Sequence, residues 1–271
     1  MIYDCFNFFN ELDLLEIRLN VLNDVVDRFV IVEANRTHQG KPKPMNLEEN
    51  WSRFKDFEHK MTYLKLEKGY PTFFTRWRPV KTWDIEYVQR EMFFEGLKEA
   101  KDEDQVIISD LDEIPRPESI SKHKNSKQAI LFHQDIFRYF LNCRCNNDRW
   151  PGSVMMPYGS LKNINTYLAR LHRDPKIVKK RGFEIIDESD GGWHFTSVGG
   201  IDHLIQKIEA FAHKEFNTNE LKDPRRLEKI IKEGGDIFGS DWKFELEEIS
   251  DTYPLYIQKN KDKYYHLLGD L

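Results

Sequence analysis

The sequence is poor in cysteine and contains no long apolar run. Its three cysteines (Cys5, Cys143 and Cys145) cannot close a disulfide framework, and the last two are spaced wrongly for a usual zinc pair. We therefore expect buried, reduced thiols and residence in the cytoplasm. Because no stretch of about 18 apolar residues occurs, we expect no transmembrane helix. The residues after Met1 also lack the basic and apolar regions of a signal peptide. A peripheral contact with a membrane surface stays open.

A surplus of charge of one sign is also missing. The 41 Lys and Arg against 46 Asp and Glu give a formal net charge of −5, which provides no overall attraction to nucleic acid or anionic lipid. We therefore expect no nucleic-acid partner. The sequence has no internal repeat and no low-complexity linker. With 271 residues, of which 39% are apolar, it predicts a globular fold rather than a disordered or collagen-like chain.

The first 115 residues alternate apolar runs with helical periodicity. The helical pattern predicts a helix over residues 12–22, with Asn10 as its cap, and another over residues 85–97. Short apolar runs predict strands at residues 3–9, 29–32, 61–66 and 106–108. This alternation is typical of a parallel α/β sheet with right-handed crossovers.

The second half has a different pattern. Residues 129–141 are β-rich, residues 150–159 read as an irregular segment, and the apolar spacing from Leu204 to Phe211 predicts a helix. Asp223 and Pro224 resemble a cap and a first-turn proline for a helix that ends near Lys232. The active site of an open α/β sheet lies beyond the carboxyl ends of its strands.

Two carboxylates follow the predicted strand at residues 106–108. In extended chain Asp110 and Asp112 share one face, and paired carboxylates at a strand end suit Mg²⁺ or Mn²⁺. Diphosphate oxygens would complete the coordination, and the metal would stabilise a departing nucleoside diphosphate. A capped, solvated loop is the alternative. A second Asp-x-Asp, at Asp102 and Asp104, lies in a polar segment that predicts a solvated turn.

A second cluster of functional residue types lies at residues 189–195. It combines Asp190, two glycines, Trp193 and His194. Glycines let the backbone approach a ligand closely, Trp is a common platform for a sugar face, and His194 offers a metal-binding nitrogen. The alternative is a turn with a core Trp and a hydrogen-bonded His.

Four motifs follow one another along the chain: DCFxFFNELDLLEIRL (4–19), VEANxTHxG (32–40), DxDEIP (110–115) and GWHF (192–195). In this order they resemble the motifs of glycosyltransferase family 17, and the resemblance runs from residue 4 to about residue 238. It implies a GT-A-type α/β fold, with a Rossmann-like mixed sheet flanked by helices. Residues 1–271 would form one catalytic domain, in which residues 1–115 bind the nucleotide sugar and residues 116–271 bind the acceptor.

The resemblance also implies an activity. The enzyme would move N-acetylglucosamine from UDP-N-acetylglucosamine onto a glycan hydroxyl, with inversion and with Mn²⁺ or Mg²⁺ as cofactor. Asp110 and Asp112 would hold the metal and the diphosphate, with Asp112 favoured as the direct ligand. His194 is the candidate third ligand, against a structural role beside Trp193.

An inverting transfer needs one carboxylate to accept the proton of the attacking hydroxyl. We favour Asp190 as this base, with Glu188 and Asp187 as competitors. Glu33 and Asn35 end the second strand, where a base or ribose is expected, although Glu33 could equally order the loop.

Weaker candidates for donor contacts are spread along the chain. Arg90 is a candidate phosphate partner, against a solvated charge, and Trp193 and Trp150 are candidates for stacking on sugars, against core packing. The remaining candidates are His38, His213, Glu215 and the basic run Lys179, Lys180 and Arg181.

Two other functions remain open from the sequence. A metal-dependent nucleotidyltransferase or phosphohydrolase would also place paired aspartates at a strand end, but the sequence has no P-loop and no G-x-G-x-x-G after the first strand. A sugar-binding protein without turnover is the non-enzymatic alternative. Such a protein would keep its sugar affinity without metal.

Overall fold

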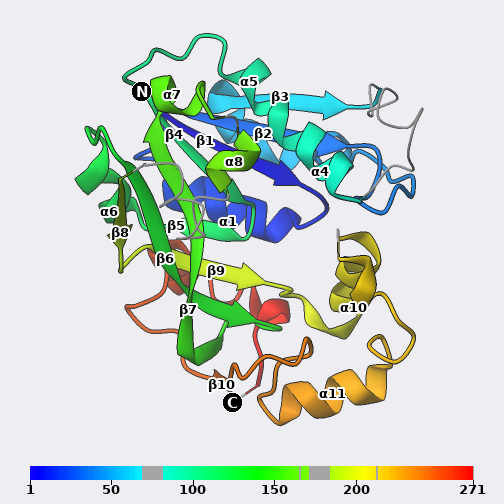
Figure 1. Cartoon of the computed structure of the whole chain (residues 1–271). Helices are drawn as coiled ribbons and strands as arrows, with labels where there is room; N and C mark the ends of the chain where they lie inside the picture. The colour runs from blue at the N-terminus through cyan, green and yellow to red at the C-terminus, as the bar shows by residue number, and fades with distance from the viewer. Residues whose placement is uncertain (69–81, 165, 171–183, 212, 271) are drawn as a thin grey trace.

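The computed structural model describes residues 1–68, 82–164, 166–170, 184–211 and 213–270. Its strands are β1 (Ile2–Phe8), β2 (Arg28–Ala34), β3 (Met61–Leu66), β4 (Gln105–Asp110), β5 (Glu113–Pro115), β6 (Ala129–Arg138), β7 (Cys143–Pro157), β8 (Ile185–Glu188), β9 (Gly192–Thr196) and β10 (Phe244–Leu246). Over the described residues they form one sheet of ten strands in the order β3-β2-β1-β4-β7-β6-β9-β5, with β10 paired to β7 and β8 paired to β6 (Figure 1).

Helices flank this sheet on both sides (Figure 1). The α-helices are α1 (Leu12–Leu22), α2 (Asn46–Glu49), α4 (Thr82–Glu91), α5 (Phe93–Gly96), α6 (Pro117–His123), α7 (Tyr158–Leu161), α8 (Thr166–Arg170), α10 (Gly200–Ala210), α11 (Pro224–Lys232) and α12 (Leu255–Lys259). Short 3₁₀ helices are η1 (Trp51–Lys60), η3 (Lys214–Phe216) and η4 (Tyr265–Leu267). The expected mixed α/β fold, with a sheet flanked by helices, is confirmed.

The alternating burial of the central strands explains the layers. Phe6 and Ile107 belong to an apolar cluster that α1 and α12 cover, whereas Cys5 and Ile108 belong to a second cluster beneath α5, α7 and α8. A third cluster packs α10 and α11 against β6, β7 and β10. Each strand of the centre is therefore buried on both faces, which is why its sequence reads as a continuous apolar run.

The strand order changes direction at β1: β2 and β3 lie on one side of β1, and β4 lies on the other. Strands β1, β2 and β3 follow one another outward with parallel pairing, and β4 then returns to pair with the other side of β1, also in parallel. Asn7 at the end of β1 is the register partner of Asp110 at the end of β4. Ligands of open α/β sheets bind at such a switch point, beyond the carboxyl ends of the strands.

Several local expectations need correction. Asn10 does not cap α1: Glu11 precedes the helix without a side-chain cap bond, and the Asn10 amide points to Gln206 instead. The helix expected over residues 85–97 is two helices, α4 and α5. The second packs so closely on β2 that a Cβ at Gly96 would lie 2.4 Å from Val30.

The segment expected to be irregular at residues 150–159 is mostly strand. Its first part belongs to β7, where pairing with both β4 and β6 overrides the local preference of Pro151 and Gly152. The pairing of β6 and β7 shifts register between Leu131 and His133, beside Pro151, and bulges are where sheets tolerate proline.

Two further expectations have mixed outcomes. Asp104 is buried rather than solvated and bonds to the amino group of Met1 and the backbone of Lys101, whereas Asp102 is exposed and pairs with Lys162. Asp223 caps α11 as expected, because its carboxylate accepts from the N–H groups of residues 225 and 226.

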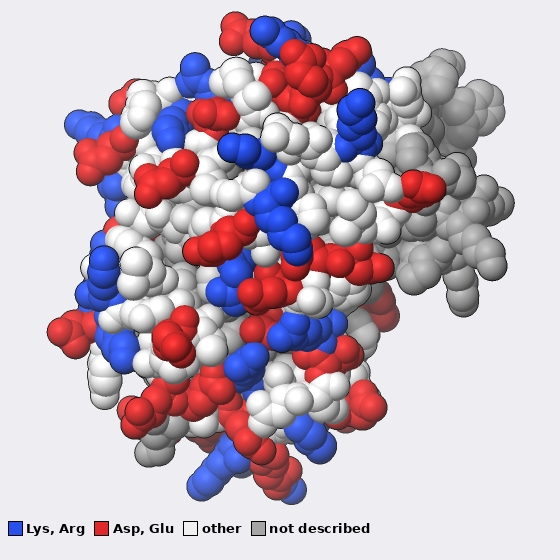
Figure 2. All heavy atoms as spheres, turned by 90° about the vertical axis from the view of Figure 1, so that its left-hand side faces the viewer, with Lys and Arg blue, Asp and Glu red and all other residues white. Residues whose placement is uncertain are grey.

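The three cysteines are free and buried, as expected. Within the described part of the chain, none of the helices is long and apolar enough to cross a membrane. On the face that Figure 2 shows, basic and acidic side chains are interspersed rather than separated by sign.

Arg18 on α1 fixes the turn that follows β4. Its guanidinium is fully buried and forms a two-pronged ion pair with Asp4 of β1, at 2.6 and 2.8 Å. The same group donates to the backbone carbonyls of Asp110, Leu111 and Glu113 at 3.0, 3.1 and 2.6 Å. One side chain therefore sets the path of the backbone that carries the Asp-x-Asp motif.

We predict that Arg18→Met destabilises the fold strongly, because it leaves the Asp4 carboxylate buried without its cation. Loss of one partner of a buried ion pair typically costs about 3–5 kcal/mol. The matched control is Arg53→Met, which removes a 30% exposed guanidinium that pairs with two acids of the same helix, and should cost under about 1 kcal/mol. Urea denaturation measures both, and equal losses would contradict the role given to Arg18.

Candidate functional site

A cavity of about 340 Å³ opens at the switch point, beyond the carboxyl ends of β1 and β4. Its walls come from the ends of these strands, from β9, and from α4 and α10. Both aspartates of the motif line it, together with Glu113, Trp150 and His194. The cavity therefore joins residues from both halves of the chain.

Asp110 lies between two guanidinium groups. One carboxylate oxygen accepts from Arg90 of α4 at 2.5 Å, and the other accepts from Arg170 of α8 at 2.6 Å. Both arginines are almost fully buried, whereas the Asp110 side chain is 41% exposed. The ion pairs raise the pKa of Arg170 against the opposing effect of its burial, so the site holds two fixed positive charges.

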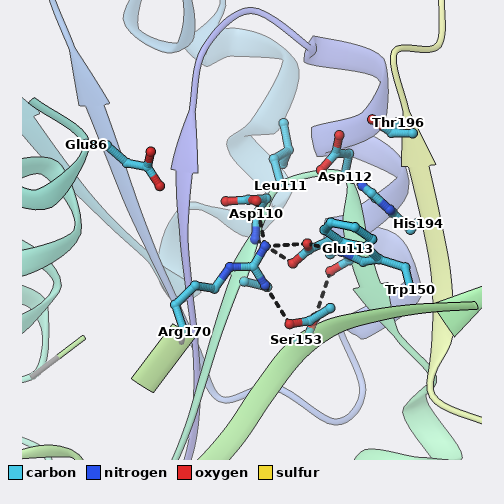
Figure 3. Close-up of polar contacts among 12 residues, drawn as sticks. Glu86, Asp110, Leu111, Asp112, Glu113, Trp150, Ser153, Arg170, His194 and Thr196 are labelled. Carbon is cyan, nitrogen blue, oxygen red and sulfur yellow. Dashed lines mark hydrogen bonds and ion pairs between the residues drawn. The ribbon is translucent and has the colours of Figure 1, made fainter. Parts of the chain in front are cut away.

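Glu113 organises the floor of the cavity (Figure 3). Its fully buried carboxylate pairs with Arg170, accepts from the Trp150 indole at 2.6 Å and accepts from the backbone N–H of Asp110 at 3.0 Å. Arg170 also donates to the carbonyl of Gly152 at 2.5 Å. This network locks the two carboxylates and the Trp150 ring in place.

Asp112 faces His194 and Lys207 across the cavity. Its carboxylate lies 2.8 Å from the Lys207 ammonium of α10 and 3.6 Å from His194 Nε2. Burial alone would raise the pKa of Asp112, but the Lys207 ammonium and the contact with His194 hold that pKa well below its usual range. The carboxylate is therefore charged at any physiological pH.

His194 enters the cavity because two glycines let β9 pass between neighbouring strands. A Cβ at Gly191 would lie 2.5 Å from the backbone of His133, and one at Gly192 would lie 2.2 Å from the carbonyl of Ile114. The glycines thus serve strand packing rather than the ligand approach expected from the sequence. His194 stacks on Trp150 at 5.1 Å, and its Nδ1 has no partner among the described residues.

The residues expected at the donor's base take different positions. Glu33 is fully buried, and its carboxylate accepts from Lys43 and Tyr63 and from the N–H groups at the start of α2. This arrangement matches the loop-ordering alternative. Asn35 at the end of β2 donates to the carbonyl of Glu67. Neither residue is among the described residues that line the cavity.

The candidate bases lie away from the cavity lining. Asp190 is 64% exposed and pairs with Arg116, and Glu188 pairs with Lys122 and His123. Asp187, also exposed, pairs with His133. None of the three lines the cavity as far as the described residues show.

Of the aromatic and basic candidates, some line the cavity and others do not. Trp193 is core: it is 2% exposed, donates to the carbonyl of Thr252 and lies under Arg116. Trp150, by contrast, lines the cavity, as do Arg90, His38 and His213.

Glu215 pairs with His213 at 2.6 Å. The basic run at residues 179–181 lies outside the described residues.

Sequence reasoning missed several residues of the site, among them Asn7, Arg138 and Lys207 in the cavity lining. It also missed Arg170, which pairs with Asp110 and Glu113. Lys207 lies on α10, whose apolar stripe was the only signal used. Asn7 carried a readable signal, because it follows buried Tyr3 and Cys5 at a spacing of two and is the polar end of that row.

The donor set for a metal is partial. Asp110 and Asp112 both offer carboxylates to the cavity, and His194 adds Nδ1, for which the described residues supply no partner. Among the described residues, however, no group of three or more His, Cys, Asp or Glu side chains is arranged to hold a metal ion. These residues would therefore fit a cation whose coordination is completed by oxygens of a bound ligand. They do not fit a metal ion coordinated by protein side chains alone.

Comparisons with known proteins extend this picture. The human β-1,4-mannosyl-glycoprotein 4-β-N-acetylglucosaminyltransferase is 23% identical over 304 residues, a match that covers 99% of this chain and 55% of that protein. The rat protein of the same name is also 23% identical, and the match covers 98% of this chain and 54% of that protein. The chain thus spans about half the length of the curated relatives it matches.

Two solved structures are similar at 10% sequence identity. The inositol-1-phosphate CTP transferase from T. maritima has a TM-score of 0.39, with 87% of this chain and 97% of that chain covered. A putative glucose-1-phosphate thymidylyltransferase from Bacillus anthracis has a TM-score of 0.37, with 70% and 87% covered.

The family comparison covers almost the whole chain, including both halves of the cavity. The model of glycosyltransferase family 17 matches residues 1–269, and the chain belongs to this family.

Proposed function

We propose that the protein is a GT-A-type, metal-dependent glycosyltransferase that moves N-acetylglucosamine from UDP-N-acetylglucosamine onto a glycan hydroxyl with inversion. The observation that carries the proposal is the pair of carboxylates, Asp110 and Asp112, in a cavity at the switch point of the sheet. The family and the relatives' names support the transferred sugar.

The charges of the cavity suit a nucleoside diphosphate. Arg90, Arg170 and Lys207 are cations fixed by buried or half-buried acids, and fixed charges in a water-poor site stabilise a developing negative charge. A divalent cation held by Asp112 and Asp110 would supply further positive charge to the departing UDP. Lys207 holds the Asp112 carboxylate in its ionised form, ready for such a ligand.

The remaining chemical step is removal of the proton from the acceptor hydroxyl. Of the carboxylates that line the cavity, Glu113 is bound by Arg170 and Trp150, and Glu86 pairs with Arg90. Within the part of the chain that the structure describes, the Glu11 carboxylate, between β1 and α1, accepts a hydrogen bond only from the neighbouring N–H of Asn10. We therefore assign the base to Glu11 in preference to Asp190.

The acceptor would enter beside the aromatic wall of the cavity. Trp150, Trp242, Phe211 and His213 line this wall, and Trp242 packs edge-on against Trp150 at 6.3 Å. Sugar rings present apolar faces that stack on such side chains. These four residues lie within 116–271, and Trp83 of α4 packs edge-on against His213 at 5.0 Å, so the N-terminal half contributes to this wall as well.

The partial donor set predicts that metal and nucleotide bind cooperatively. Mn²⁺ alone should bind weakly, and titration calorimetry should show that saturating Mn²⁺ tightens UDP binding about 10-fold or more, with the reciprocal effect of UDP on Mn²⁺ required by linkage. Asp112→Asn should abolish this coupling.

Asp102→Asn is the matched control, because Asp102 belongs to the other Asp-x-Asp, is exposed and lies in a turn. Its coupling should equal that of the wild type. UDP binding that is tight and indifferent to Mn²⁺ in the wild type would overturn the metal-dependent mechanism, and sugar binding without any nucleotide binding would favour the non-enzymatic alternative.

The assignment of the base gives a second prediction. Glu11→Gln should keep UDP affinity within about twofold but reduce sugar transfer, or UDP release from the donor, about 10²–10⁴-fold. Asp190→Asn is the comparison and should retain most of the activity. The reverse result, loss in Asp190→Asn alone, would return the role to Asp190.

A further inference from the structure

Lys207 binds the carboxylate that the proposed function gives to a metal ion. Its ammonium lies 2.8 Å from one oxygen of Asp112, and the other oxygen faces His194 Nε2 at 3.6 Å. Both oxygens belong to one small group, so a divalent cation on either of them would lie close to the ammonium. Like charges this close repel each other. Lys207 and a metal ion therefore compete for one carboxylate.

The two carboxylates of the motif differ in how firmly their cations are held. Asp110 is bound by Arg90 and Arg170, whose side chains are each only 4% exposed. The side chain of Lys207 is 30% exposed, and its other contact, with the hydroxyl of Thr196, is a long one at 3.5 Å. A lysine ammonium also sits on a flexible four-carbon stem. Of the cations that hold the motif, Lys207 is thus the one that can leave.

A displaced ammonium needs a new counterion. Among the acids in the described lining, Asp110, Glu86 and Glu113 are already paired with arginines. Glu11 attracts the Lys207 ammonium, but less strongly than its present partner does. The oxygens of a diphosphate would supply the missing negative charge, because ammonium groups bind phosphate well as point charges.

We infer that Lys207 couples the binding of the metal to the binding of the nucleotide, an inference that rests on the proposed function. Without ligands its ammonium neutralises Asp112. In the complex it binds the diphosphate and leaves that carboxylate to the cation. A cation that arrives alone must displace Lys207 when no counterion is ready to receive it, which weakens binding. The nucleotide removes this penalty, and Lys207 then stabilises the charge that develops on the departing UDP.

The test uses Lys207→Gln, which removes the charge and keeps a polar side chain. Mn²⁺ alone, followed through the electron paramagnetic resonance of the free ion, should bind this variant of the full chain about 5–100-fold more tightly than the wild type. Mn²⁺ should also raise the Tm of the variant more than it raises that of the wild type. Titration calorimetry at saturating Mn²⁺ should show the opposite effect on UDP, which should bind the variant more weakly.

Two further variants separate the charge of Lys207 from other effects. Lys207→Arg keeps the positive charge and should keep the weak binding of Mn²⁺ alone. Lys222→Gln is the matched control, because Lys222 pairs at 2.7 Å with Glu209 of the same helix, α10, but is not among the described residues that line the cavity. This variant should bind Mn²⁺ and UDP as the wild type does.

The outcomes separate the inference from the proposed function. If Mn²⁺ and UDP are coupled in the wild type and equally coupled in Lys207→Gln, the inference falls and the function stands. A gain in Mn²⁺ affinity with unchanged UDP affinity overturns the contact with the diphosphate, and the same gain in Lys222→Gln would show a general effect of charge and also overturn the inference. If the wild type shows no coupling, the metal-dependent function is wrong and the inference falls with it.

Discussion

The arrangement of the site depends on the buried guanidinium of Arg18. It joins Asp4 of β1 to the backbone carbonyls of Asp110, Leu111 and Glu113. It also donates to the hydroxyl of Ser109. A planar group with five N–H donors can serve these six acceptor atoms when one N–H is shared between two carbonyls. The carboxylates on the cavity side of this turn keep their positions because the opposite side of the backbone is held by Arg18.

On the cavity side, acids and bases alternate in a connected series. Asp110 is shared by Arg90 and Arg170, Arg170 is shared by Asp110 and Glu113, and Asp112 pairs with Lys207. Such a network is favourable only while every charge has its counterion, because an isolated ion in this environment is strongly penalised. In the mechanism we propose, an incoming diphosphate and cation would exchange partners with this network without creating a bare charge.

The sequence predicted the central strands, the α1 and α11 helices and the location of the Asp-x-Asp motif, since these follow from local periodicity and capping. It could not predict the partners of that motif. Arg170 approaches it because α8 packs against β4 and β7. Lys207 approaches it through the packing of α10, and neither contact leaves a local pattern. The position of Trp150 could not be predicted for the same reason, because its strand pairs with β6. Glu33 was also misleading: its acidity and its position at a strand end suggested a ligand contact, but its hydrogen-bond donors come from the following loop.

The insertion of β9 between β5 and β6 has a consequence for the order in which the molecule is assembled. Glu113 and His194 become neighbours only through this pairing, and the strands involved lie far apart along the chain. Contacts of such long sequence separation form late and slowly during folding. A partly folded or newly synthesised chain therefore presents the aspartates of the motif well before it presents His194 and Lys207, and the cavity is complete only in the fully folded molecule.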